Sequence, residues 1–129
     1  MREPEPFAGW RVVAAPPALD ALEARTGAGV ALRIAADDLL VLSGGEQPAL
    51  DDPDAIVEPE TGFVGWELDS PAVRALLVRH VEWRPPAPRP TLAQGLVAAV
   101  PAKLWLREDG SALLLCLAAY AAELEARLA

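Results

Sequence analysis

Among the side chains that could act as a nucleophile, an acid or a base, we consider four in particular: His80, Cys116, Glu67 and Asp69. A catalytic thiol or hydroxyl needs a base beside it, so Cys116 or a serine would have to lie near His80, the only histidine in the chain. Cys116 stands within the apolar run Leu113–Leu117, where a thiol behaves as a small hydrophobic side chain and has little help in ionising. This position favours a place in the core.

His80 falls on the apolar stripe of a helix that the spacing predicts over Pro71–Val81. Near a helix C-terminus an imidazole is favoured electrostatically, and we interpret His80 as a structural residue hydrogen-bonded to a carbonyl. Glu67 and Asp69 have the chemistry of an acid and a base, but nothing in the sequence shows either of them buried or paired. We therefore assign no catalytic residue.

Binding motifs for metals and phosphates are equally missing from the pattern. The acidic loop 44–60 invites a calcium interpretation, but its spacing lacks the alternating oxygen ligands, the central glycine and the closing glutamate of such a loop. The sequence contains no glycine-rich phosphate cradle and no His/Cys pair at metal-ligand spacing. We expect no metal site, and the sequence identifies no cofactor-binding residue.

Tryptophans and cations give a different kind of candidate. Along Val100–Arg107 the apolar residues alternate with Pro101, Lys103, Trp105 and Arg107, so a strand would send these four to the side opposite the apolar set. Tryptophan and arginine are enriched at protein interfaces. We take Lys103, Trp105 and Arg107, together with Trp83 beside a proline-rich stretch, as interface candidates; local packing is the alternative for the tryptophans.

The elements that position these residues form a strand, a turn, a strand and a helix in the C-terminal third. Asp109-Gly110 suits the positive φ angles of a hairpin turn. Ala112–Leu117 is apolar throughout, as expected of a strand covered on both faces. The residues from Ala118 to Leu128 are rich in helix formers. Thr91–Ala99 fits either the start of a strand or a helical turn, and we favour a strand with Pro101 at an edge or bulge.

The rest of the chain predicts further strands and two helices. Ser70 stands where a helix cap is needed, before Pro71. The segment 83–90 is a stiff, extended connection. The other expected elements are strands over Trp10–Ala15, Val30–Ile34, Leu39–Leu42 and Phe63–Leu68, and a helix over Pro17–Thr26.

These elements predict one α+β domain over residues 1–129, with a mainly antiparallel sheet, helices packed on one face and a β-α-β-β-α-type second half. Residues 1–9 form a loose lead-in in this prediction, 44–60 an acidic loop and 83–90 a proline-rich connection. Hydrophobic residues make up 53% of the 129, which excludes a disordered chain.

Charge and hydropathy limit the partners. A net charge of −8 argues against nucleic acid and against anionic membranes, which select clustered basic residues. The longest apolar run is far short of a membrane span, no signal-peptide pattern follows Arg2, and a single cysteine suits a reducing compartment. We expect a soluble cytoplasmic protein.

The residues from Phe63 to Leu128 resemble a known family. FVGWELDSPAVRALLVRHVEW, the proline stretch, TLAQGLVAAVPAKLWL and the terminal AAYAAELEARL are similar to the gamma subunit of heterotetrameric sarcosine oxidase, a family related to the folate-binding aminomethyltransferase of the glycine cleavage system. The resemblance implies an accessory subunit in sarcosine catabolism and one-carbon metabolism. FAD, FMN, NAD and tetrahydrofolate would belong to the larger flavoprotein subunits of the hetero-oligomer.

Three functional hypotheses follow. The first is a non-catalytic accessory subunit of a sarcosine-oxidase-like, folate-linked amine-oxidising complex, an oxidoreductase in which this chain is not catalytic alone. The alternative is a free-standing small domain that binds a folate-like ligand in a cleft lined by Trp66 or Trp105. The third is a small enzyme that uses Glu67, Asp69 or His80.

Overall fold

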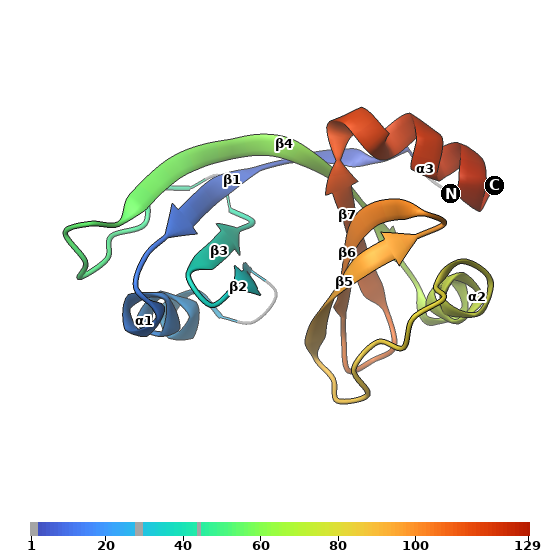
Figure 1. Cartoon of the computed structure of the whole chain (residues 1–129), viewed down its shortest axis with the longest axis horizontal. Coiled ribbons are helices and arrows are strands. Elements are labelled where there is room, and N and C mark those ends of the chain that lie inside the picture. Colours follow the sequence, from blue (N-terminus) through green and yellow to red (C-terminus); the bar gives the residue numbers. More distant parts are fainter. Residues whose placement is uncertain (1–2, 28–29, 44) are drawn as a thin grey trace. The chain divides into compact units, whose positions relative to one another are not determined.

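The computed structural model describes residues 3–27, 30–43 and 45–129 of the chain (Figure 1). Seven strands form one sheet in the order β2-β3-β1-β4-β7-β6-β5. Antiparallel pairs join β1 with β3, β2 with β3, β4 with β7, β5 with β6, and β6 with β7. The predicted α+β class is confirmed. In chain order the elements are β1 (Glu5–Val13), α1 (Pro16–Thr26), β2 (Ala31–Ala35), β3 (Asp38–Val41), β4 (Ile56–Leu68), α2 (Ser70–His80), β5 (Thr91–Val97), β6 (Val100–Leu106), β7 (Ala112–Leu117), the 3-10 helix η1 (Ala118–Tyr120) and α3 (Ala121–Leu128).

Within the single domain that the sequence predicts, the chain forms two compact units. We name Phe7–Gly62 the N-terminal unit, and Met1–Pro6 with Phe63–Ala129 the C-terminal unit. Their charges differ: the N-terminal unit has three basic and ten acidic residues, and the C-terminal unit has eight basic and nine acidic ones. Almost all of the net charge of −8 therefore belongs to the N-terminal unit.

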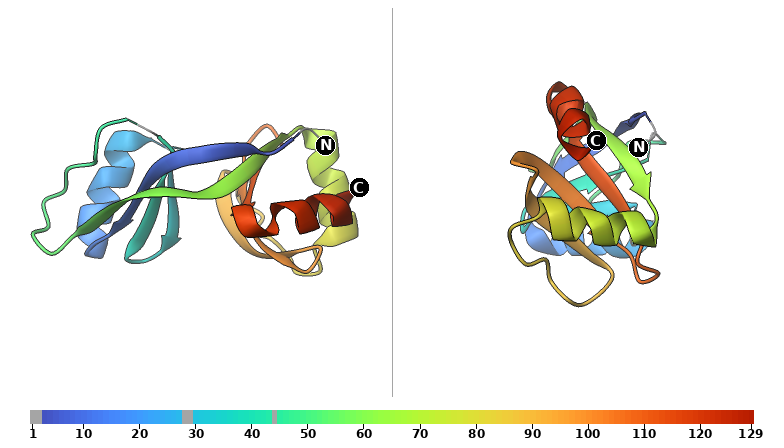
Figure 2. Two further views of the ribbon diagram at one scale, coloured as in Figure 1. Left: turned by 90° about the horizontal axis from the view of Figure 1, so that it is seen from above. Right: turned by 90° about the vertical axis from the view of Figure 1, so that its right-hand side faces the viewer.

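In the N-terminal unit, α1 packs beside β1, β2 and β3 (Figure 1; Figure 2). Leu19 and Leu22, one helical turn apart, are its buried residues, and they join a core with Val12, Leu39 and Val41. Pro16 occupies the first turn of α1, where its missing N–H costs no hydrogen bond. The helix begins and packs as its apolar spacing predicts.

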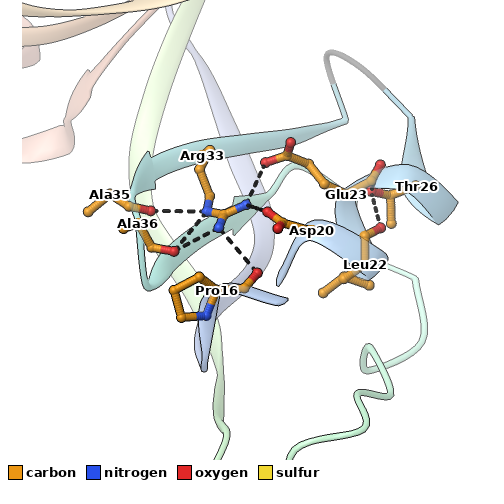
Figure 3. A network of polar contacts seen from close by, with 8 residues as sticks. All are labelled: Pro16, Asp20, Leu22, Glu23, Thr26, Arg33, Ala35 and Ala36. Carbon is orange, nitrogen blue, oxygen red and sulfur yellow. Dashed lines mark hydrogen bonds and ion pairs between the residues drawn. The ribbon is translucent and has the colours of Figure 1, made fainter. Parts of the chain in front are cut away.

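Arg33 of β2 fastens α1 to the β2–β3 turn (Figure 3). Its guanidinium donates to Asp20 Oδ1 at 2.9 Å and to Glu23 Oε1 at 3.4 Å on α1. The same group donates to the carbonyl oxygens of Ala35 and Ala36, the latter at 2.7 Å from Nη2. A planar fork of donors can serve all of these acceptors at once, which an ammonium group cannot do.

In the C-terminal unit, α2 and α3 both cover one face of the sheet, as predicted (Figure 1; Figure 2). Val73 and Leu76 of α2 and Leu124 of α3 join the core that the alternate residues of β6 enter. Burial along β6 alternates as the sequence predicts, with Val100, Ala102, Leu104 and Leu106 buried and the residues between them more exposed. The first five residues of β7 are all buried.

Several boundaries differ from the prediction. Residues from Glu5 onward belong to β1, so the expected loose lead-in 1–9 is wrong from that point, and Met1 and Arg2 lie outside the described residues. β4 begins at Ile56, so the end of the acidic loop 44–60 is strand. Proline is compatible with strand dihedrals where its position needs no ladder donor, and β4 contains Pro59. Gly44 of that loop is not among the described residues.

The entry to α2 also differs in detail. Asp69, not Ser70, is the N-cap, and its Oδ1 accepts from the backbone N–H of Ala72 at 2.9 Å. Ser70 Oγ instead accepts from the Arg74 guanidinium. Thr91–Val97 is a strand, which is the alternative that the sequence favours. Pro101 of β6 pairs with Leu96 of β5, whereas the pairing of β6 with β7 does not extend as far as Pro101. Its missing N–H therefore leaves no gap in that ladder.

Candidate functional site

A hollow of about 390 Å³ lies at the C-terminal end of α2, and we name it the α2-end hollow. It is built from the last turn of α2, the residues that follow it, and the β5–β6 turn. A second hollow, of about 170 Å³, lies on the other side of the same helix end and shares Arg79 and His80 with the first. The α2-end hollow is lined by Arg79, His80, Glu82, Trp83, Leu96, Ala98 and Ala99.

The indole of Trp83 forms a fixed wall of this hollow. Its Nε1–H donates to the carbonyl oxygen of Leu96 at 2.8 Å. The ring lies directly against Gly95, where a Cβ would come within 2.6 Å of ring carbon Cε2, so only glycine leaves room for it. A hydrogen bond and close packing thus hold Trp83, one of the predicted interface residues, in one orientation.

The β5–β6 turn beside the hollow is conformationally unusual. Ala98 and Ala99 have φ angles of 48° and 64°, both in the left-handed region. A two-residue hairpin turn of this kind normally contains Asn-Gly or Asp-Gly, and each alanine costs roughly 1–2 kcal/mol there. Two bonds hold the strained peptide: Ala98 N–H donates to the His80 carbonyl oxygen at 2.8 Å, and the Ala98 carbonyl accepts from Arg127 of α3 at 2.8 Å. Strained backbone of this kind concentrates at functional sites.

The charges around the hollow have no partner among the described residues. Arg79, the imidazole of His80 and Glu82 form no side-chain hydrogen bond or ion pair there. The hydrogen bond that we predicted for the His80 imidazole is not formed; it is the backbone carbonyl of His80 that accepts. Most arginines of the described chain are, in contrast, bonded to acids or carbonyls, as Arg107 is to Glu67.

The face that carries Lys103, Trp105 and Arg107 is a second candidate. Trp105 is half-buried on this face. Lys103 Nζ lies 5.7 Å from the centre of the Phe63 ring and donates to Gln94 Oε1 at 2.8 Å. Arg107 forms a bidentate ion pair with Glu67 at 2.7 and 3.0 Å, and this bond raises the pKa of the guanidinium. Both cations therefore have partners within the chain.

Exposed apolar side chains extend this face toward the β5–β6 turn. Leu96 of β5 pairs with Pro101 of β6, and Leu117 of β7 pairs with Phe63 of β4. Continuing the β6–β7 register by two residues brings Pro101 beside Leu117. Leu96 is 53% exposed and Leu117 is 44% exposed. We name Leu96, Pro101 and Leu117 the apolar row; it lies on the face of Trp105, and Leu96 at its end also lines the α2-end hollow.

The residues with catalytic chemistry have structural roles or stand apart. Glu67 is bonded to Arg107, and Asp69 caps α2. Cys116 is 1% exposed in the core, and burial raises the pKa of its thiol, which favours the neutral form. Its core position confirms the sequence interpretation. No cluster of three or more potential metal ligands occurs in the part of the chain that the structure describes.

The second hypothesis names Trp66 and Trp105 as residues that line a cleft. Trp66 is only 3% exposed and therefore lies in the core, and its buried indole N–H has no acceptor among the residues that the structure describes. Trp105 does not line the α2-end hollow. A further hollow, of about 410 Å³, lies in the N-terminal unit beside Arg25, whose guanidinium already bonds the Ala49 carbonyl.

Sequence reasoning missed Arg79, Glu82 and the Ala98-Ala99 turn. One signal was available: two strands joined by a two-residue turn without glycine or asparagine imply backbone strain. The longest α-helices of the described chain have 11 residues, about half of what a bilayer crossing requires.

No family model matches this chain, and neither the curated proteins nor the solved structures contain a match to it.

Proposed function

We propose that this chain is a non-catalytic accessory subunit of a sarcosine-oxidase-like, folate-linked amine-oxidising complex, and that it binds the larger flavoprotein subunits through the face of Trp105 and the apolar row. FAD, FMN, NAD and tetrahydrofolate are bound by those larger subunits in this proposal. The chain contributes binding surface and no reacting group.

The observation that carries the proposal is the exposed apolar row beside Trp105. Isolated apolar side chains on a surface are ordinary, but Leu96 pairs with Pro101, and extending the β6–β7 register by two residues brings Leu117 beside Pro101. A half-buried tryptophan lies on the same sheet face. An apolar centre with an aromatic anchor and a rim of charged residues is the usual composition of a protein interface.

The element order supports the family assignment in this proposal. The resemblance covers a strand, a helix, a proline-rich link, a hairpin, a strand and a terminal helix. β4, α2, residues 81–90, β5 with β6, β7 and α3 follow one another in that order. This support rests on the order of helices and strands alone, because the resemblance carries no catalytic motif.

A reconstitution experiment tests the proposal. The flavoprotein subunits of such a complex, prepared without this chain, are mixed with it and analysed by size-exclusion chromatography with light scattering, and oxidation of N-methylglycine is measured. We expect stoichiometric co-elution at about 50 µM of each component, well above a Kd of about 1 µM for a modest specific interface. Separate elution at that concentration, with turnover unaffected by the chain, would refute the proposal.

Matched variants locate the surface. Leu117→Asp places a charge in the apolar row and should weaken assembly at least tenfold, about 1.4 kcal/mol. Val78→Asp makes the same kind of change on the outer surface of α2, where Val78 is 85% exposed and lies off the sheet face. It should leave assembly unchanged. Equal effects of the two variants would remove the apolar row from the interface.

A further inference from the structure

The α2-end hollow has the size of a small-molecule site. Its volume of about 390 Å³ falls at the lower end of the range of ligand pockets, roughly 300–1,000 Å³. Such pockets combine an apolar wall with a few polar groups that orient the ligand. The hollow has this composition, since its lining includes Trp83 and Leu96 together with Arg79, His80 and Glu82.

The apolar wall is preorganised. Trp83 is held by its bond to the Leu96 carbonyl and by its contact with Gly95, so a flat ligand meets an indole that loses no freedom on binding. Ala98 and Ala99 also line the hollow and occupy little space there with their small side chains, although their left-handed backbone favours other residues. The turn therefore leaves space in the hollow for a ligand, although its backbone is strained.

The polar groups favour a carboxylate. The Arg79 guanidinium lacks an acid partner within the described chain, and its planar fork matches a carboxylate in bidentate geometry. His80, the next residue, offers a second donor in the same hollow. Glu82 opposes an anion, but it is exposed and solvent screens its charge.

We propose that the α2-end hollow binds a small organic carboxylate with a planar apolar body, the carboxylate paired with Arg79 and the body stacked against Trp83. Leu96 lines the hollow and also belongs to the apolar row, but the groups that would hold this ligand, Arg79, His80 and the Trp83 ring, lie at the end of α2 and not on the face of Trp105.

Titration of the full chain by ¹H–¹⁵N NMR tests this site. The probe is 3-phenylpropionate, with 3-phenylpropionamide as its uncharged counterpart and acetate as the carboxylate without a ring. We expect the acid to shift the Trp83 indole N–H and the backbone of Arg79, with a Kd of about 1 mM for a ligand of this size. The amide and acetate should bind at least about tenfold more weakly, since each lacks one of the two contacts.

Charge variants give the matched controls. Arg79→Gln should weaken binding of 3-phenylpropionate about tenfold, whereas Arg84→Gln, an exposed arginine outside the hollow, should leave it unchanged. Glu82→Gln should tighten binding two- to threefold, about the effect of removing one screened like charge. All three residues lie on the surface, and an unchanged spectrum outside the site verifies that each variant is folded.

Three results would overturn the proposal: no saturable shift at about 20 mM acid, some twenty times the expected Kd; equal affinity for acid and amide; or equal losses from Arg79→Gln and Arg84→Gln. These outcomes leave the assembly face untouched, because the NMR titration contains no partner subunit.

Discussion

At the scale of residues, charged side chains in this protein mostly serve to fix the fold. Glu67, with the chemistry of a catalytic acid, holds Arg107 by two bonds, and Asp69 holds the first turn of α2. Sequence identifies such residues by type but not by partner, because Glu67 and Arg107 are 40 positions apart and meet only when β4 and the end of β6 come together. The types of these residues were readable from the sequence; their pairing was not.

Asp52 shows a role for the acidic loop that its composition does not suggest. Its Oδ2 accepts from the backbone N–H of Ala15, the residue before α1, at 2.9 Å, and its Oδ1 accepts from Asp54 N–H at 2.9 Å. These two bonds, the Ala15 bond first, lower the pKa of the carboxyl. The charged carboxylate therefore ties the loop to the start of α1.

A pH-dependent effect follows for Asp52. A carboxyl with a lowered pKa stabilises the fold above its unfolded pKa, about 3.9, and this contribution is lost as pH falls through the folded value. Asp52→Asn should therefore lower the urea midpoint at pH 7, and the gap to the unaltered chain should narrow at about pH 3. Asp51→Asn, which removes a neighbouring charge without these bonds, is the control. A gap that is the same at both pH values would contradict the prediction.

Arg33 carries the second prediction at this scale. Arg33→Lys keeps the charge but cannot reach Asp20, Glu23 and two carbonyls together. We expect a loss of about 1–2 kcal/mol in the free energy of unfolding, measured by urea melts. Arg84→Lys, at an exposed position without such bonds, should change it by less than about 0.5 kcal/mol. If Arg33→Lys loses no more stability than Arg84→Lys, the network of bonds around Arg33 adds nothing to the free energy of unfolding.

At the scale of elements, strands could be predicted where the alternation of apolar residues and the residues of the adjoining turn both indicate a strand. Val100–Leu106 alternates, Gly110 has the positive φ that its turn needs, and the run Ala112–Leu117 contains no polar residue. The start of β4 was missed because its first half, with Glu58, Pro59 and Glu60, reads as loop. Pairing in the sheet overrides local propensity there. The α2-end hollow was not predictable, since it joins segments that only packing brings together.

The β5–β6 hairpin gives a test of stored strain. Replacing Ala98-Ala99 by Asn-Gly supplies residues that adopt left-handed angles, and it should stabilise the chain by about 1 kcal/mol after the entropy cost of glycine. The measurement is the urea midpoint of the double variant. Replacing Ala118-Ala119, exposed alanines of η1 without a positive φ, by the same pair should not stabilise. A destabilised hairpin variant would show that the strain is not in the turn.

At the scale of the whole molecule, the fold class was predictable and the division into two units was not. Helix and strand order determine the class, whereas the boundaries at residues 6 and 62 fall inside the continuous strands β1 and β4, where no loop marks them. Charge offered a partial signal, because the acids gather in 37–60. A partner attracted by negative charge would therefore meet the N-terminal unit, and the proposed assembly face belongs to the nearly neutral one.

Substitution of Trp105 tests whether the C-terminal unit contacts the proposed partner. Trp105→Ala should leave the isolated chain folded, with less than about 1.5 kcal/mol lost, because the side chain is half-buried. If the chain assembles with larger subunits as proposed, the variant should weaken that assembly by about 2 kcal/mol, as loss of an aromatic anchor does. Urea melts and light scattering on the same preparation separate the two effects. A collapse in stability would place Trp105 in the core, and unaltered assembly would exclude this face.

The division of the chain has a consequence for the order in which the protein is made. The whole N-terminal unit, Phe7–Gly62, is translated before the 67 residues that complete the C-terminal unit. At about 5–20 residues per second, the ribosome needs roughly 3–13 s for that remainder, much longer than a small unit needs to collapse. Nascent chains stalled once Gly62 has left the exit tunnel should resist protease over α1 and β2–β3. During that time the first residues of β1 would remain an unpaired strand end, because the residues that pair with them have not yet been synthesised.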